Sequence, residues 1–276
     1  MRKEISCRNK RSGRLPRGKR AFLLAMLIAA AVLCTGCRGG GEAAVEGSRG
    51  EEAGEPFKEQ EAEEITGLAH ETASDGEVDF EALKEENPDI FAWLHIPGTG
   101  IDAPVLQSME SDDYYEGHNA YGEEDGKGAL YTELANLTSM CDFNTVIHGK
   151  GGEGMPFEGL YQFADPDFFE SHEEFTLYLE GNVLTYTVFA SYEREDTSLI
   201  RSYDFTYGLG CAQFLKDMYS VREMGKNLRE GWEEVTPYHF LVTLTTESRG
   251  NPGKQFVVLG ALTGDAAGAI DRVVEW

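Results

Sequence analysis

Several side chains in this 276-residue sequence could do chemistry, and their spacing decides which chemistry they support. His172 lies among glutamates, as a metal ligand could, but so dense a charge run is typical of a solvated surface. The run Gly149-Lys150-Gly151-Gly152 is similar to part of a phosphate-binding loop, yet no Ser or Thr follows Lys150 and no helix is predicted next. Asp165 and Asp167 flank Pro166, which predicts a turn rather than a carboxylate pair. We expect no metal site and no cofactor.

Cysteine thiolates would be the strongest nucleophiles available to this chain. Beyond the N-terminal region the sequence has Cys141 and Cys211. Cys211 falls on the apolar face of a predicted helix and Cys141 just before a predicted strand, positions at which a small buried cysteine is the usual occupant. The two could pair, but an even count does not by itself establish a disulfide.

The N-terminal region has the pattern of an export signal. Residues 1–20 contain nine basic residues and one acid, and residues 21–34 form an apolar run that is short for a membrane-spanning helix, which needs about 20 residues. The run leads into Cys34-Thr35-Gly36-Cys37, which resembles a bacterial lipoprotein signal with Cys37 as the lipidated first mature residue. An uncleaved signal anchor is the alternative for residues 1–37. Both predict attachment to the extracytoplasmic face of the cell membrane.

The charge of the chain argues against nucleic acid as a partner, because the formal net charge is −25. Residues 1–37 hold nine of the 24 basic residues and one of the 49 acids, so the remainder carries a charge of −33. A domain this acidic needs a tether to stay at an anionic membrane. Residues 38–78 are rich in Gly, Glu and Ala and poor in apolar residues, which predicts a disordered acidic stalk. The folded domain is expected over 79–276.

The folded part has mostly the patterns of β-strands. Phe80 and Leu83 predict a short helix that ends at Asn87-Pro88. Short apolar or alternating runs predict seven strands: Ile101–Gln107, Gly128–Thr132, Asn144–His148, Glu174–Glu180, Val183–Ser191, His239–Thr246 and Phe256–Leu262. One stretch, Gly208–Leu228, has helical spacing and lies before the last two strands. These elements predict a barrel or sandwich with an inserted helix.

Several segments in the same order strongly resemble class B sortases, which are cysteine transpeptidases on the outer face of Gram-positive membranes. The segments are Asn87–Gln107, Asp112–Glu133, Asn144–Phe163, Phe240–Glu247 and Gln255–Leu262. The resemblance covers essentially all of 79–262. It implies a closed eight-stranded β-barrel with an N-terminal helix and a helical insertion before the last two strands.

The three catalytic positions of that family are substituted. The family's His ends a motif like Asn-Thr-Val-Ile-Tyr-Gly-His, and Lys150 stands there. Its Cys closes Thr-Leu-Ser-Thr-Cys, and Glu247 stands there. The family's Arg lies eight residues after that Cys, and Gln255 stands at this position. We expect Lys150 and Glu247 to form an ion pair, since their ordinary pKa values leave both charged near neutral pH. His148 matches the family's Tyr and is a possible neighbour of the site, while His118 matches a histidine that is not catalytic.

The substitutions lead to three function hypotheses. The leading one is a membrane-tethered pseudo-sortase that binds a sorting-signal-like peptide, a pilin or a partner sortase without transpeptidation. The second is an enzyme with altered chemistry that uses Glu247, Lys150 and His148 for hydrolysis or an amine reaction. The third is a structural envelope protein whose groove is closed. The remaining way in which the chain could be an active transpeptidase is a catalytic thiol at Cys141 or Cys211.

Overall fold

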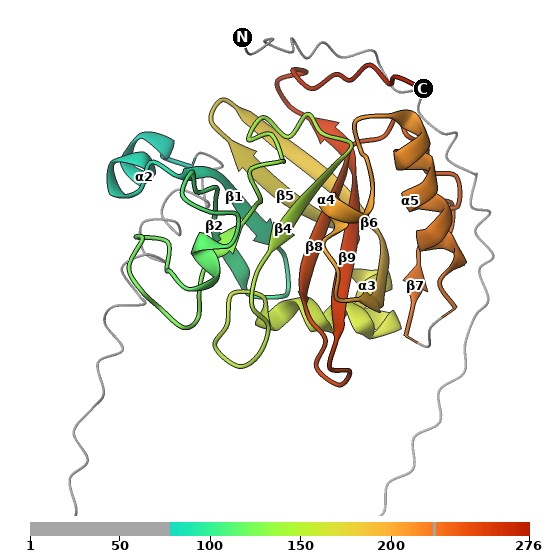
Figure 1. The fold of residues 1–276 in the computed structure, drawn as a ribbon, viewed down its shortest axis with the longest axis horizontal. Coiled ribbons are helices and arrows are strands. Elements are labelled where there is room, and N and C mark those ends of the chain that lie inside the picture. Colours follow the sequence, from blue (N-terminus) through green and yellow to red (C-terminus); the bar gives the residue numbers. More distant parts are fainter. Residues whose placement is uncertain (1–77, 223–224) are drawn as a thin grey trace, which may run out of the picture.

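The computed structural model describes residues 78–222 and 225–276. One sheet runs in the order β5-β1-β2-β3-β4-β8-β9-β6-β7, and β5 also pairs with β6, which closes the first eight strands into a barrel (Figure 1). The strands are β1 (Ile90–Ile96), β2 (Ile101–Leu106), β3 (Leu130–Tyr131), β4 (Asn144–His148), β5 (Glu174–Leu179), β6 (Asn182–Glu195), β7 (Asn227–Leu228), β8 (Leu241–Glu247) and β9 (Lys254–Asp265). The eight-stranded barrel implied by the resemblance is therefore confirmed.

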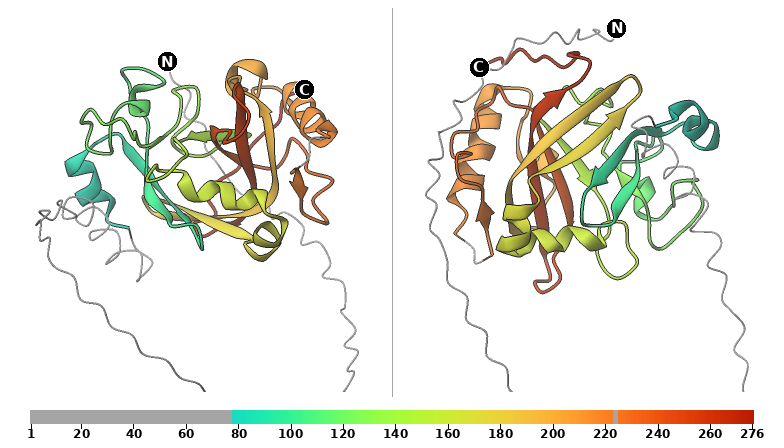
Figure 2. Two further views of the ribbon diagram at one scale, coloured as in Figure 1. Left: turned by 90° about the horizontal axis from the view of Figure 1, so that it is seen from below. Right: turned by 180° about the vertical axis from the view of Figure 1, so that it is seen from behind.

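Helices surround the barrel on several sides. They are α2 (Phe80–Glu86), the 3-10 helices η1 (Tyr114–Glu116) and η2 (Glu158–Ala164), then α3 (Pro166–Ser171), α4 (Leu199–Ser202) and α5 (Gly208–Ser220). Figure 2 shows α3 across one end of the barrel and α5 along its outer wall. The N-terminal helix and the insertion before β8 and β9 match the expectation. No helix in the described ranges is long and apolar enough to cross a membrane.

Strands β4, β8 and β9 are buried on both faces, because one hydrophobic core lies inside the barrel and a second lies outside it. Ile147, Val242 and Val258 pack inside the barrel, with η2 and α3 at its end. Val146 and Val257 point outward and pack against the inner face of α5. Because successive residues of a strand face opposite sides, the polar residues that share the outward face lie beneath α4 and α5 or at the ends of these strands.

Two elements differ from the sequence prediction. Strand β1 was missed, because its residues are buried on both faces and lack the alternation that marks a half-buried strand. Helix α5 ends at Ser220 rather than at Leu228. Its last carbonyls are satisfied by Lys226, whose ammonium donates to Met218 O at 2.7 Å and to Tyr219 O at 3.3 Å, which ends the helix before the short strand β7.

The acidic pair around Pro166 is a helix start rather than an isolated turn. Asp165 caps α3 by accepting hydrogen bonds from the backbone N–H groups of Asp167 and Phe168, and Pro166 occupies the first helical position. The export signal with Cys37 and the stalk of residues 38–78 lie outside the described residues, except for residue 78.

Candidate functional site

The sequence-predicted positions come together at one pocket on the outer face of the barrel. Parallel pairing of β4 and β8 sets His148 opposite Thr245, and antiparallel pairing of β8 and β9 sets Glu247 opposite Gln255. Lys150 follows β4 at the same end. All five residues line a cleft of about 370 Å³ that the segment leading into α4 borders on its other side.

Lys150 and Glu247 do not form the expected ion pair. The Lys150 ammonium donates to Gly126 O at 2.9 Å, so it reaches across to the loop that precedes β3. Within the described ranges, no ion pair joins it to Glu247. The turn after β4 carries the lysine side chain away from the end of β8, which strand register alone could not reveal.

Glu247 is held by donors from its own neighbourhood. Its Oε2 accepts from the Gly151 N–H at 3.1 Å and from the Thr246 hydroxyl at 2.8 Å. Position 151 must be a glycine, because an added Cβ would lie 2.7 Å from the Thr246 hydroxyl oxygen and closer still to the Tyr161 ring. The Tyr161 hydroxyl in turn donates to Glu247 O at 2.6 Å. The carboxylate therefore fastens the Gly151 turn to the end of β8.

Gln255 is almost fully buried and its amide group is occupied. It is 8% exposed. Its Oε1 accepts from the Thr245 hydroxyl at 2.5 Å, and its Nε2 donates to Thr197 O at 3.1 Å and Glu195 O at 3.4 Å. The side chain ties the connection between β6 and α4 onto β8 and β9. A substrate approaching along the cleft would find both amide N–H groups of Gln255 engaged and one lone pair of Oε1 occupied.

His148 has a carboxylate partner that the sequence did not single out. Its Nε2 lies 3.3 Å from Glu133 Oε1, and its ring stacks on Tyr131 with centroids 5.1 Å apart. The Ser198 hydroxyl also donates to Glu133 Oε1 at 3.3 Å. The contact with His148 lowers the pKa of Glu133 against the opposing effect of burial. Sequence spacing gave no signal for the pair, because only the pairing of β3 with β4 brings the two residues together.

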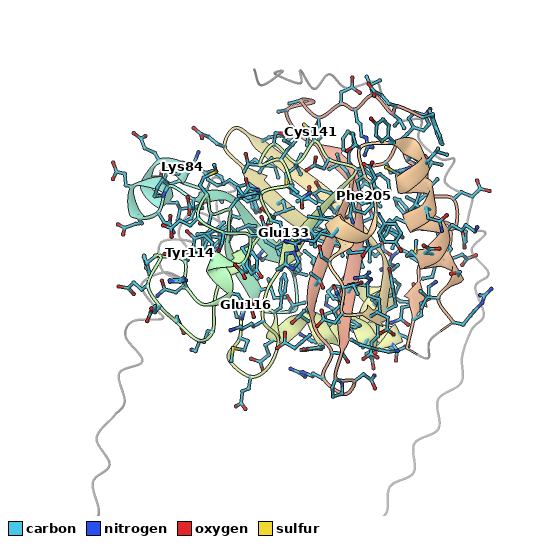
Figure 3. All side chains as sticks on the ribbon, viewed as in Figure 1. Lys84, Tyr114, Glu116, Glu133, Cys141 and Phe205 are labelled. Atoms are coloured by element: carbon cyan, nitrogen blue, oxygen red, sulfur yellow. The ribbon has the colours of Figure 1, made fainter. Side chains whose placement is uncertain are left out.

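Neither candidate cysteine lies at this cleft, and Cys141 is disulfide-bonded. Cys211 is a free, buried thiol on α5, and burial raises its pKa, which disfavours the thiolate. Since Cys211 is free, it does not pair with Cys141. Cys141 precedes β4, at the opposite end of that strand from His148 and Lys150. Figure 3 shows Cys141 near the top of the view and Glu133, which contacts His148, near its middle. The cleft residues within the described ranges include no cysteine.

The two other histidines that the sequence analysis considered, His118 and His172, are packed side chains. His118 stacks on Tyr114 with centroids 3.9 Å apart, and its Nδ1 is 2.7 Å from Tyr114 O. His172 stacks on Phe168 and its Nδ1 is 3.0 Å from Phe168 O. In the part of the chain that the structure describes, no group of three or more His, Cys, Asp or Glu side chains is arranged to hold a metal ion.

Comparison with known proteins agrees with this geometry. No protein-family model matches the chain. Sortase B of Listeria monocytogenes is 35% identical over 127 residues, which covers 44% of this chain and 50% of that protein. This chain is a homologue of the class B sortases. The match spans about half the length of the curated relatives, so the sortase fold and homology are established here and their activity is not carried over.

Solved sortase structures share the whole barrel. A mutant form of Clostridium perfringens sortase B aligns with a TM-score of 0.64 at 23% identity, over 76% of this chain and all of that one. The Staphylococcus aureus sortase B–substrate complex aligns with a TM-score of 0.61 at 23% identity, over 73% of this chain and 94% of that one. At this identity the likeness concerns the fold. The sortase-like barrel thus presents Lys150, Glu247 and Gln255 at one cleft, each engaged in local hydrogen bonds.

Proposed function

We propose that this protein is a membrane-tethered pseudo-sortase, which binds an extended peptide in the cleft beside Lys150, Glu247 and Gln255 and does not transfer it. One observation carries the proposal: all three side chains bond to groups of the protein itself, and no cysteine lines the described cleft. Acyl transfer by a sortase needs a thiolate that attacks and later leaves. A carboxylate attacking an amide would give an unstable anhydride, and Gln255 supplies no charge for an oxyanion.

The cleft keeps features suited to peptide recognition. It continues into a second hollow that shares Tyr131, His148 and Ser198 and reaches Arg201. The S. aureus relative is solved as a complex with a substrate, which supports peptide binding by the same fold. Glu116, Asp196 and Glu247 line this cleft against a single lysine. The excess of carboxylates favours a peptide that carries a basic side chain.

The proposal includes attachment of the chain to the membrane through residues 1–37. The basic and apolar pattern of residues 1–37 supports attachment outside the cytoplasmic membrane, by lipid on Cys37 or by an uncleaved anchor. Mass spectrometry of the N-terminal peptide from membranes of an expressing bacterium distinguishes the two. A diacylglycerol-modified Cys37 supports the lipoprotein form, and an intact residue 1–37 segment supports the anchor.

The binding test uses the purified full chain and a phage-displayed library of extended peptides. We expect enriched peptides to contain a basic residue, to bind in fluorescence anisotropy, and to remain uncleaved in mass spectrometry. Glu247→Gln is expected to weaken binding about fivefold, because it removes one charge from the cleft, while iodoacetamide leaves binding unchanged. Absence of any enriched peptide would instead favour a structural protein with a closed groove.

A second candidate, hydrolysis, has one observation in its favour. Glu133 Oε1 lies 3.3 Å from His148 Nε2 without hydrogen-bond geometry, and a small rotation of the ring would give the arrangement by which a carboxylate orients an imidazole as a general base. This candidate predicts peptide cleavage that His148→Gln abolishes while peptide affinity is kept. Cleavage lost in Glu247→Ala but kept in His148→Gln would assign the carboxylate instead. Either result would overturn the pseudo-sortase proposal.

A further inference from the structure

A second and larger cavity lies outside the barrel at the end of β4 that faces away from Lys150. Its volume is about 780 Å³, within the range of small-molecule sites. Three segments distant in sequence form it: residues 135–144 before and at the start of β4, residues 200–206 after the start of α4, and residues 271–275 near the C-terminus. Lys150, Glu247 and Gln255 take no part in it.

Two buried hydrogen-bond donors at this cavity have no partner. Asn144 is 0% exposed, and its Oδ1 accepts from the Thr243 hydroxyl at 2.9 Å, but its Nδ2 bonds to nothing. Asn144 shares the outward face of β4 with Val146, so its side chain points out of the barrel toward the cavity. The Nη1 of Arg272 is also buried and unpaired.

Arg272 is positioned by its Nη2 group and by the face of its guanidinium. Its Nη2 donates to Phe205 O at 3.1 Å and contacts the Cys211 sulfur at 3.3 Å, and its Cζ lies 5.2 Å from the ring centroid of Phe143. The C-terminal segment that carries it is fixed on both sides. Ile270 packs in the barrel core, and Glu275 O accepts from the Gly208 N–H at the start of α5. The unpaired Nη1 is therefore held in place rather than left on a loose tail.

Carboxylates occupy other parts of the same wall. Asp142 is buried enough that desolvation raises its pKa, although its Oδ2 accepts from the Leu137 N–H at 2.6 Å. Asp204 and Asp271 each accept one backbone N–H bond through one oxygen, which leaves their second oxygens for another donor. The cavity thus presents unpaired donors and available acceptors together, with aromatic side chains between them: Phe143, Tyr203 and Phe205.

We propose that this cavity is a binding site for a free α-amino acid with an apolar or aromatic side chain. Arg272 Nη1 and Asn144 Nδ2 donate to the ligand carboxylate, the cavity carboxylates accept from its ammonium group, and the aromatic rings contact its side chain. A buried donor without a partner destabilises the fold, and a carboxylate offers the acceptor oxygens that both donors lack. The planar fork of an arginine suits such a group.

The first experiment is isothermal titration calorimetry on the full chain with four probes. Free phenylalanine presents both charges, N-acetylphenylalanine only the carboxylate, phenylalanine amide only the ammonium, and glycylphenylalanine both charges on separate residues. We expect phenylalanine to bind at least tenfold more tightly than the amide, and more tightly than the dipeptide. Tighter binding of the dipeptide would point to a peptide terminus as the occupant. Equal or tighter binding of the amide, or no binding by any probe, would overturn the proposal.

A variant tests the donor directly. Arg272→Lys keeps the positive charge but removes the fork, so we expect phenylalanine affinity to fall at least tenfold. Arg222→Gln is the matched control, because Arg222 is exposed and lies away from this cavity. Circular dichroism establishes that each variant is folded. Unchanged affinity in folded Arg272→Lys contradicts the assignment of Arg272, and the four-probe comparison on the unmodified chain decides the ligand class if the variant does not fold.

Discussion

The two ends of the β4–β8 strand pair differ in how their polar side chains are bonded. At the His148 end, Lys150, Glu247 and Gln255, which we predict to stand at the catalytic positions of a sortase, are bonded to nearby backbone and hydroxyl groups, and only the buried Nε2 of the neighbouring His148 makes no hydrogen bond in the described part of this end. At the Asn144 end, donors of Asn144 and Arg272 are buried without partners. Natural proteins satisfy almost all buried polar groups, so unpaired ones call for a reason. The three predicted catalytic side chains thus have local bonding partners, whereas the Asn144 end has two buried donors that the proposed amino-acid ligand would pair.

The largest expected effect at the His148 end is that of Gly151→Ala. The new methyl group would collide with Tyr161 and Thr246 and displace the N–H that bonds Glu247. We expect the free energy of unfolding to fall by about 2–3 kcal/mol, the usual cost of overpacking plus a lost charge-assisted bond. Urea denaturation measures it.

Gly126→Ala is the matched control, since an added Cβ there meets nothing within 4 Å. We expect this change to lie within about 1 kcal/mol of the unmodified protein. A Gly151→Ala protein as stable as the control would mean that the Gly151 turn is free to move and that the Glu247 carboxylate does not hold it at the end of β8.

A smaller effect is expected from Gln255→Ala. The change leaves the Thr245 hydroxyl and the Thr197 carbonyl without their side-chain partner, which should cost about 1–2 kcal/mol. It should also release the connection between β6 and α4, seen as faster amide hydrogen exchange over residues 195–198. Gln213→Ala, on the exposed face of α5, should change neither quantity. Unaltered exchange in Gln255→Ala would mean that other contacts, and not the Gln255 side chain, hold that connection in place.

Much of this molecule could be predicted from sequence, and the rest depended on contacts between distant segments. Alternation and motif order gave seven of the eight barrel strands, and the missed β1 was hidden by burial on both faces. Motif spacing identified Lys150, Glu247 and Gln255 as one site. It could not give their partners, because the turn after β4 decides where the lysine reaches. Glu133 and Arg272 carry no local pattern, since β3 and the C-terminal segment bring them into place only in the folded chain.

The smallest effect concerns the contact of Glu133 with His148, at the His148 end. Its partners lower the pKa of Glu133 in the folded state, so its ionised form stabilises the fold above the ordinary glutamate pKa. That contribution should be lost as pH falls through the lowered value. Glu133→Gln is therefore expected to cost about 1 kcal/mol at pH 7 and less at pH 3, by urea denaturation. Exposed Glu153→Gln should cost little at either pH. A cost for Glu133→Gln that does not change with pH would mean that packing, not charge, holds Glu133 beside His148.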